Sequence, residues 1–383
     1  MRIPDLSTPH RVSTSRFSPT LIAALLLSCA VTGCGGTANT DTASGGGSSS
    51  PRRIILLTNG NSPFWDAARF GLQKAAKELA IDEAGLQAVM EVNDGSPQGQ
   101  INKLRQFASQ SDIAGIAVSA LDADNVAVAD EMRRLRKKGV HVICVDADLN
   151  RKTLRDARDY YIGTDNLSAG RTLGKAAKKL LETRRVEKGS YVQFVGRTGS
   201  YNARERMDGF REAIGEAYHE ADRMGDDLDR TRARDNVRNA IRNHPDLVAL
   251  VGIWSYNAPA IVDVVQQENI RDKVTVVTFD AEPIAIGQMR DGSIDVMIVQ
   301  NPFDMGYRAV KLLKALCEKD QKTVDTMFPH RDAPDGDLYN TGLKLIVPDD
   351  KGPLKAAEFD GATEFMTLDK FQAWLDQYGL KGS

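Results

Sequence analysis

The sequence predicts an α/β protein of two lobes, each a doubly wound parallel sheet with helices on both faces. Three observations predict this fold class. From Ile54 onward, short apolar runs alternate with amphipathic segments of helical period. A charged, irregular stretch, Asp148–Asp159, interrupts the alternation, which then restarts. The chain has 383 residues, a length that suits two domains of ordinary size.

The first strand and helix form the most informative unit. Ile54–Thr58 begins with four apolar residues, two of them β-branched, which is typical of a strand buried on both faces. Ser62 can cap a helix whose first position is Pro63. Phe64 and Trp65 then lie at the carboxyl end of the first strand, where open α/β sheets bind ligands. Ordinary core packing of the two rings is the alternative.

The other elements follow in order along the chain. Short apolar runs predict strands at 88–92, 115–118, 140–145, 160–163, 190–195, 247–251, 274–279, 296–299 and 343–347. Amphipathic periods predict helices at 64–80, 98–109, 123–137, 166–183, 202–217, 231–243, 258–268, 283–290, 304–317 and 368–378. Because strands and helices alternate, the crossovers should be right-handed and the sheets parallel.

Composition excludes several classes of function. The net charge is −2, and acids are interspersed in the Arg-rich stretches 151–158 and 230–242, so we expect solvated helix faces and no nucleic-acid partner. No CxxC or HExxH pattern occurs, and the five histidines are scattered, so neither a metal nor a cofactor is expected. Cys144 and Cys317 are expected as separate thiols, with a disulfide between them as the alternative.

The N-terminus is predicted to be an export signal. Arg11 and Arg16 precede the apolar run Leu21–Val31, which is too short to span a bilayer. The residues ending at Cys34 resemble a bacterial lipobox, so we expect residues 1–34 to be a lipoprotein signal and Cys34 to be lipidated. Cleavage without a lipid is the alternative. The Gly/Ser-rich stretch 35–51 is expected to be a flexible tether.

The interruption at Asp148–Asp159 suggests where the lobes divide. We expect an N-terminal lobe of residues 52–150 plus 281–302, and a C-terminal lobe of residues 151–280 plus 303–347. Residues 348–383 are then a C-terminal tail.

Polar or aromatic residues recur where the predicted strands end. Capping or turn formation explains each one alone, but the recurrence suggests a binding site. Carboxylates, amides and a guanidinium can bind vicinal hydroxyls, and aromatic rings can cover the faces of a sugar. Such groups reject analogues that lack a hydroxyl, because their partners would be buried unpaired. The candidate ligand-binding residues are Ser62, Phe64, Trp65, Ser119, Asp146, Asp148, Arg204, Trp254, Asn257, Asp280 and Gln300.

Five motifs carry a family resemblance. They are Asn61–Trp65, Tyr161–Asn166 with Ala169-Gly170, Ala203–Phe210, Phe279-Asp280 and Gln300–Pro302. In their order and spacing, the chain resembles the periplasmic sugar-binding proteins of the ribose-binding (type I) superfamily, the solute receptors of ABC importers. The resemblance covers about residues 52–347.

The resemblance implies roles for some of these residues. Phe64 and Trp65 match the aromatic pair that sandwiches the sugar, and the hydroxyl-binding positions are Asp146, Arg204, Asp280 and Gln300. The departures from ribose receptors fall at Ser62, Ser119 and Trp254, which replace Asn, at Ala147, which replaces Arg, and at Leu228, which replaces an aromatic residue. Asp148 is expected to compensate partly for Ala147, and Trp254 to cover the ring face in place of Leu228. These departures count against ribose itself, and a monosaccharide or polyol is the expected ligand.

The resemblance also implies a mode of action. The chain would be an exported, lipid-anchored monomer that delivers its sugar to an ABC permease in the membrane. Three crossing strands, expected near 148–160, 280–285 and 300–304, would form a hinge. The sugar would shift an open–closed equilibrium toward the closed state.

Three alternatives stay open at this point. Asp146 and Asp280 could be the paired carboxylates of a glycosidase, roughly 5 to 9 Å apart. Transcription regulators share this architecture, although they carry a helix-turn-helix where this chain has its export signal. A receptor for signalling or chemotaxis that binds a sugar or an autoinducer would have the same fold but a role other than transport.

Overall fold

The structure of the protein is a computed structural model that describes residues 50–383. The predicted signal, including Cys34, and nearly all of the predicted tether lie outside the described residues. None of the helices within 50–383 combines the length and the apolarity needed to cross a membrane. Cys144 is buried and Cys317 half-buried, and both are free thiols.

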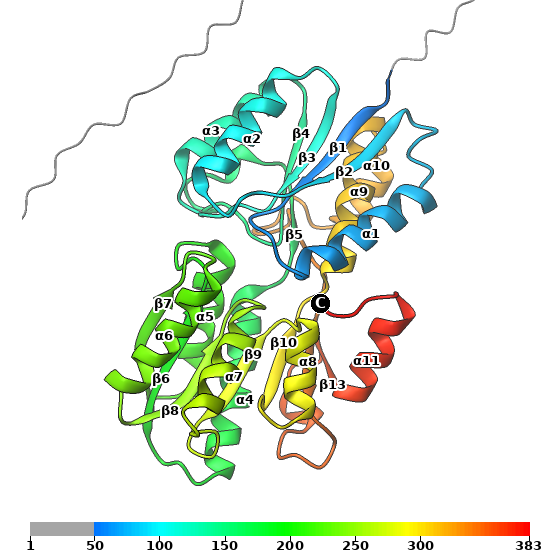
Figure 1. Ribbon diagram of the computed structural model, residues 1–383. Helices are drawn as coiled ribbons and strands as arrows, with labels where there is room; N and C mark the ends of the chain where they lie inside the picture. Colours follow the sequence, from blue (N-terminus) through cyan, green and yellow to red (C-terminus); the bar gives the residue numbers. More distant parts are fainter. Residues whose placement is uncertain (1–49) are drawn as a thin grey trace, which may run out of the picture. The chain divides into compact units, whose positions relative to one another are not determined.

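The first sheet has six parallel strands in the order β11-β5-β4-β3-β1-β2. Helices α1, α9 and α10 pack on one face, and α2 and α3 cover the other (Figure 1). The strands are β1 (Arg52–Leu57), β2 (Leu86–Glu91), β3 (Ile113–Val118), β4 (His141–Val145), β5 (Tyr161–Gly163) and β11 (Leu338–Asn340). The helices are α1 (Phe64–Glu78), α2 (Pro97–Ser109), α3 (Val126–Lys137), α9 (Pro302–Glu318) and α10 (Gln321–Met327), with a 3₁₀ turn at Arg155–Ala157.

The second sheet has seven strands in the order β13-β12-β10-β9-β8-β6-β7, parallel except where β10 meets β12. Helices α4 and α5 cover one face, and α6, α7, α8 and α11 cover the other. The strands are β6 (Gly189–Val195), β7 (Tyr218–Gly225), β8 (Leu247–Gly252), β9 (Thr275–Phe279), β10 (Val296–Val299), β12 (Leu343–Val347) and β13 (Thr363–Thr367). The helices are α4 (Asn166–Thr183), α5 (Tyr201–Ile214), α6 (Arg230–Asn243), α7 (Asn257–Gln267), α8 (Pro283–Arg290) and α11 (Leu368–Gln377), with a 3₁₀ turn at Ala356–Glu358.

The two sheets repeat one strand order. Counted from the first strand of each lobe, both read 2-1-3-4-5, as β2-β1-β3-β4-β5 and β7-β6-β8-β9-β10. In such sheets the strand order reverses between the first and third strands, and ligands bind at the carboxyl ends there. The predicted fold class, two doubly wound lobes, is therefore confirmed.

The strand pairing corrects the expected division of the chain. The segment 151–163 stays with the first sheet, because β5 pairs with β4. The segment 281–299 belongs to the second sheet, because β10 pairs with β9. Residues 302–340 return to the first sheet through α9 and β11, and the expected tail supplies β13 to the second.

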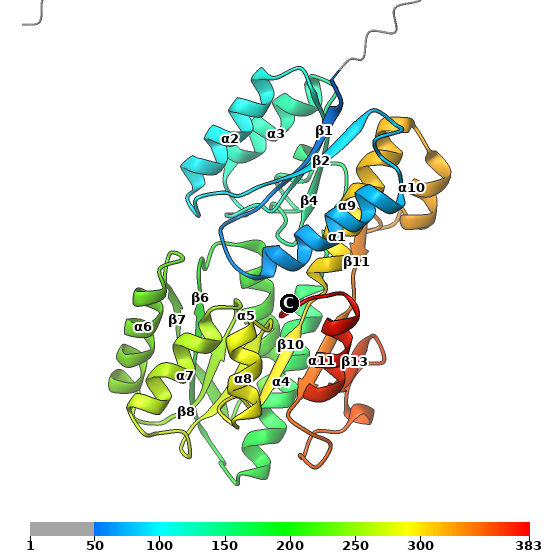
Figure 2. The ribbon, with the colours of Figure 1, turned by 45° about the vertical axis from the view of Figure 1, so that its right-hand side comes forward.

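The chain crosses between the sheets three times, as expected for a three-stranded hinge. The crossings join β5 to α4, β10 to α9, and β11 to β12 (Figure 2). Of the expected positions, only 300–304 coincides with a crossing. Residues 148–160 remain in the first lobe and 280–285 in the second, so the other two crossings lie near 164–165 and 341–342 instead.

Candidate ligand-binding site

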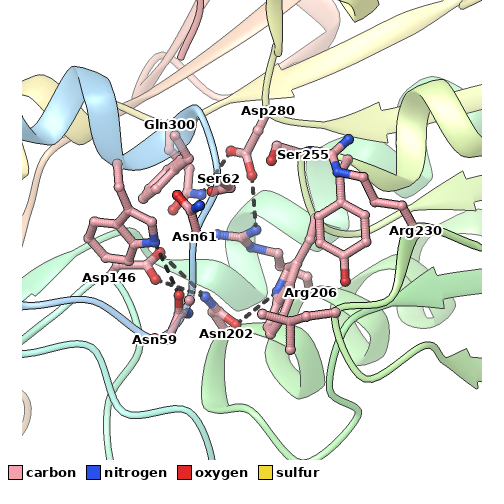
Figure 3. A pocket seen from close by; sticks show the side chains of 16 residues that line it. Asn59, Asn61, Ser62, Asp146, Asn202, Arg206, Arg230, Ser255, Asp280 and Gln300 are labelled. Atoms are coloured by element: carbon pink, nitrogen blue, oxygen red, sulfur yellow. Dashed lines mark hydrogen bonds and ion pairs between the residues drawn. The ribbon is translucent and has the colours of Figure 1, made fainter. Parts of the chain in front are cut away.

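A pocket lies between the two lobes at the carboxyl ends of their strands (Figure 3). It contains about 540 Å³ of space free of atoms, a volume that includes open solvent at its mouth. We call it the interlobe pocket. Its lining residues are Asn59, Gly60, Asn61, Ser62, Phe64, Trp65, Asp146, Asn202, Arg206, Leu228, Arg230, Trp254, Ser255, Tyr256, Asp280 and Gln300.

The start of α1 supplies an aromatic wall. Phe64 and Trp65 are buried and meet edge to face, with ring centroids 5.1 Å apart. The indole Nε1 of Trp65 donates to Asn59 Oδ1 at 3.1 Å, so the loop after β1 fixes the orientation of the ring. A rigid indole face of this kind can cover the C–H groups of a small ligand.

Asp146, directly after β4, belongs to a polar network that crosses between the lobes. Its carboxylate accepts from Ser119 Oγ at 3.0 Å and from Asn202 Nδ2 at 3.3 Å. Asn202 in turn accepts through Oδ1 from the indole Nε1 of Trp254 at 3.2 Å. Burial raises the pKa of Asp146, and the charge of Arg206 and these two hydrogen bonds oppose the rise.

Asp280 occupies the matching position in the second lobe, directly after β9. Gln300 Nε2 donates to Asp280 Oδ1 at 2.8 Å, and Gln300 Oε1 accepts from Thr164 Oγ1 at 3.0 Å. Burial raises the pKa of Asp280 to about 6, against the lowering effect of Arg206 and Gln300. Its Oδ2 lies 3.7 Å from Arg206 Nη1, which leaves this oxygen available to a ligand.

Arg206 of α5 is the buried guanidinium of the pocket, with 1% of its surface exposed. Its Nε donates to Asn166 Oδ1 at 3.0 Å and its Nη1 to the carbonyl of Ile253 at 3.1 Å. The guanidinium carbon lies 4.6 Å from the centroid of the Phe279 ring. Nη2 is buried and has no hydrogen-bond partner, which is costly for a charged donor and marks a position where an acceptor is needed.

The rim of the pocket belongs mainly to the second lobe. Arg230 forms an ion pair with Glu282 at 3.0 Å and lies over the Tyr256 ring at 5.2 Å. Across the mouth, Leu228 Cδ2 is 2.5 Å from the place a Cβ would occupy at Gly60, so a side chain at position 60 would require the Leu228 side chain to move. The rim thus closes over the pocket from both lobes.

The structure brings seven of the predicted residues together and leaves four outside. The seven that line the pocket are Ser62, Phe64, Trp65, Asp146, Trp254, Asp280 and Gln300. Ser119 lies behind the wall and reaches the cavity only through Asp146. Asn257 accepts from the Trp254 amide and bonds Asp226, so it supports the loop after β8.

Asp148 and Arg204 point away from the pocket, which corrects both expectations. Asp148 is buried against Arg158, with their ion pair at 2.5 Å, and so does not replace the missing arginine of the pocket. Arg204 pairs at 2.5 Å with Asp124 on the surface of the other lobe. Positions 204 and 206 are about 200° apart around a helix, so they cannot share a face.

Several lining residues were not predicted as ligands: Asn59, Asn61, Asn202, Arg206, Arg230, Ser255 and Tyr256. For two of them the sequence did contain a signal. Ala203, Met207 and Phe210 define the buried face of α5, and Asn202 and Arg206, one turn apart, border that face. Among residues 50–383, no cluster of His, Cys, Asp and Glu is arranged to hold a metal ion.

Comparison with known proteins identifies the family. Residues 54–321 match the model of the periplasmic binding protein domain. The D-allose-binding periplasmic protein of Escherichia coli is 25% identical over 265 residues, 68% of this chain and 82% of that protein. The ribose import binding protein RbsB of Bacillus subtilis is 23% identical over 274 residues, 69% of this chain and 81% of that protein.

Solved structures share the fold. An ABC transporter solute-binding protein of Burkholderia graminis, in complex with D-arabinose, aligns with a TM-score of 0.66 and 24% identity over 80% of this chain and 99% of that one. A periplasmic solute-binding protein of Actinobacillus succinogenes with bound D-allose aligns with a TM-score of 0.63 and 19% identity over 77% and 96%. The family is one of binding proteins, which rules out the glycosidase alternative. With the family model matching well over half of its length, this chain belongs to the periplasmic binding protein family.

Proposed function

We propose that this protein is the sugar receptor of an ABC importer and captures a monosaccharide or polyol in the interlobe pocket. The unpartnered Nη2 of Arg206 beside the carboxylates of Asp146 and Asp280 carries the proposal. The guanidinium requires an acceptor and the carboxylates require donors. A hydroxyl group supplies both, and adjacent hydroxyls on one ring can satisfy all three residues together.

The aromatic residues support a ring-shaped ligand. Trp65 from the first lobe and Trp254 from the second both line the pocket, and each indole N–H is already bonded, to Asn59 and Asn202 respectively. The rings therefore offer apolar faces and no further donors. Such faces suit the C–H groups of a sugar.

The charges around the pocket favour a neutral ligand. Glu282 neutralises Arg230, which leaves the carboxylates of Asp146 and Asp280 facing the single guanidinium of Arg206. A ligand carboxylate would add a third negative charge to a buried site. We expect an uronic acid to bind at least tenfold more weakly than the neutral sugar with the same ring.

The named relatives support the transport role. They include a D-allose-binding protein and ribose import binding proteins, and structures similar in fold contain D-arabinose or D-allose. Delivery to an ABC permease extends these roles to this chain. With the predicted signal and lipidation at Cys34, the receptor would be exported and attached to a membrane by its lipid.

A sugar titration tests the proposal. We expect the full-length chain to bind at least one of D-ribose, D-allose, D-arabinose, D-glucose and D-galactose near micromolar affinity, about −8 kcal/mol. Calorimetry gives the affinity, and a change in tryptophan emission reports on the indoles of the pocket. D-Glucuronate against D-glucose is the matched pair for charge. Absence of binding across the neutral panel would refute the proposal.

Transport and anchoring need separate tests. Cells that lack the gene should lose uptake of the radiolabelled sugar and regain it with the wild-type gene. Labelling with radioactive palmitate should be lost in Cys34→Ser. Retained uptake in the deletion strain would contradict the transport role while leaving sugar binding intact.

A further inference from the structure

The last five residues of the sequence, Gly379–Ser383, return to two loops beside the interlobe pocket. After α11 the chain runs back between the lobes and ends beside β10 and α1 (Figures 1 and 2). Leu380 and Ser383 are 5% and 3% exposed, so the segment is anchored at both places. We call Gly379–Ser383 the strap.

The strap bonds to the backbone of two loops that carry pocket residues. The Ser383 amide donates to the Ala281 carbonyl at 3.0 Å, and the Ala281 amide donates to the Ser383 carbonyl at 2.6 Å. Ser383 Oγ donates to the Gln300 carbonyl at 3.0 Å. One residue of the strap thus contacts both the neighbour of Asp280 and the backbone of Gln300.

These hydrogen bonds lie next to a residue with an unfavourable backbone conformation. Asp280 has a φ of 61°, in the left-handed region that is unfavourable for residues with a side chain. Its own amide donates to the Ile298 carbonyl at 2.7 Å, and the next amide, that of Ala281, donates to the strap. The peptide unit that follows Asp280 is therefore fixed from outside the β9–α8 loop.

Gly382 allows the strap to approach this closely. A Cβ at position 382 would lie 2.5 Å from the Ala281 carbonyl oxygen and 2.9 Å from Pro283 Cδ. Ala281 belongs to the loop that holds Asp280, and Pro283 begins the helix that follows it. A larger residue at 382 must therefore move the strap away from the loop.

We propose that the strap positions Asp280 and Gln300 for ligand binding, so that Ser383 and Gly382 help to set affinity and selectivity without touching the ligand. Because Gln300 Nε2 bonds Asp280 Oδ1, displacement of either backbone disturbs both side chains. The inference rests on the proposed sugar-binding function of the pocket.

Three variants, one truncated and two of full length, test the strap in graded steps. Deletion of residues 381–383 removes all contacts of Ser383 but keeps Leu380 in the core. Gly382→Val displaces the strap, and Ser383→Ala removes only the hydroxyl bond to Gln300. Gln377→Ala, at an exposed position at the end of α11, is the matched control.

The sugars of the titration panel and their 2-deoxy analogues are the probes. We expect at least tenfold weaker binding of the preferred sugar for the deletion and for Gly382→Val, and a two- to threefold loss for Ser383→Ala. Discrimination between the sugar and deoxy analogues should fall as well, because misplaced Asp280 and Gln300 no longer select for hydroxyls. Gln377→Ala should match the wild type in both measurements.

Two measurements distinguish the positioning role of the strap from an effect on protein stability and from a failure of the proposed function. A lower thermal midpoint with unchanged affinity and discrimination would overturn the positioning role. Amide hydrogen exchange at Ala281 needs no ligand, and it should accelerate at least tenfold in the deletion. If the wild type bound no sugar, the proposed function would fail. Unchanged amide exchange at Ala281 in the deletion variant would independently overturn the positioning role of the strap.

Discussion

The two pocket carboxylates share an unusual backbone conformation. Asp146 has a φ of 62° and Asp280 a φ of 61°, and each directly follows the fourth strand of its lobe. Left-handed residues other than glycine cost on the order of 1–2 kcal/mol, and such residues cluster at functional sites. Equivalent strain at equivalent positions turns one carboxylate from each lobe toward the same cavity.

Arg206 should dominate affinity among the charged residues. Arg206→Ala leaves buried acceptors without their donor, so we expect a loss of roughly 2–5 kcal/mol, about 30-fold or more, in sugar affinity. Arg204→Ala, two positions earlier on α5, removes a surface ion pair and should cost less than about 1 kcal/mol. Calorimetry on both variants makes the comparison, with cooperative thermal unfolding as the check on folding. Equal losses would contradict the assignment of Arg206 to the pocket.

The titration of Asp280 should make sugar binding depend on pH. Its pKa lies at about 6 in the ligand-free protein, against an ordinary value of 3.8. A hydroxyl donated to the carboxylate favours the charged form, so affinity should fall below pH 6 by up to about tenfold per pH unit. Between pH 6 and 3.8 the folded protein binds a proton that the unfolded chain does not, so this group makes the ligand-free protein more stable as pH falls.

Asp280→Asn isolates that contribution. The amide cannot titrate, so the part of the pH dependence due to Asp280 should disappear, and the affinity at pH 7.5 should fall toward the low-pH value of the wild type. Affinities measured from pH 5 to 8 on both proteins make the comparison. An identical pH profile in the variant would assign the titration to another group, such as Asp146.

At the scale of elements, glycines set how closely the paired helices approach. A Cβ at Gly306 of α9 would lie 2.0 Å from the Ala68 carbonyl oxygen of α1, and one at Gly71 would lie 1.9 Å from that of Phe303. The close contact fixes the start of α1, which carries Phe64 and Trp65. Gly170 and Gly209 play the same part between α4 and α5.

Two alanine substitutions test this reading of the helix contacts. Gly306→Ala overpacks the α1–α9 contact and should reduce the free energy of unfolding by about 1–3 kcal/mol or more. Gly287→Ala, in α8 with no atom within 4 Å of the new methyl group, should raise it by about 0.5–1 kcal/mol. Denaturant titrations measure both. A neutral effect at Gly306 would mean that the helices can separate without cost.

Local sequence patterns predicted most helices and strands but not which strands pair with each other. The helix at 166–183 and the strand at 343–347 have the predicted bounds, because caps and apolar periods are local signals. The strand β7 was missed, since it is an edge strand whose residues are mostly half-buried or exposed and form no apolar run. The lobe boundaries were wrong because pairings such as β5 with β11, over 170 residues apart in sequence, leave no local trace.

The residues of the candidate site also fall into two groups, those that local sequence signals located and those that depend on the fold. Strand ends located Asp146, Asp280 and Gln300, because carboxyl ends of parallel strands meet at one edge. The prediction of Arg204 rather than Arg206 was wrong because the two residues lie on different faces of α5, and only the face of Arg206 is buried. Arg230 reaches the pocket only through the fold of the loop after β7, a strand that the sequence did not reveal.

At the scale of the whole described chain, direct contacts join the lobes beside the pocket. The Ala123 amide donates to the Gly199 carbonyl at 3.2 Å, and Ser200 Oγ donates to the Leu121 carbonyl. Asp124 and Arg204 form the ion pair at 2.5 Å. We call this group of contacts the latch. None of its atoms is needed to line the pocket, so it stabilises the closed arrangement independently of a ligand.

The latch should therefore tune affinity through the open–closed equilibrium. The apparent dissociation constant is the intrinsic constant divided by the fraction of protein that is closed. Asp124 and Arg204 are about half and one third exposed, so solvent screening limits their pair to about 0.2–1 kcal/mol. Asp124→Asn should weaken sugar binding by no more than about fivefold. It should also increase the radius of gyration of the ligand-free protein in small-angle scattering, and saturating sugar should restore the wild-type value.

Salt provides the control. In 0.5 M NaCl the sugar affinity of the wild type should approach that of the variant, because salt screens exposed ion pairs but not the buried Arg206. A salt-independent difference, or an unchanged radius of gyration, would mean that Asp124 acts locally and that closure depends on the ligand alone.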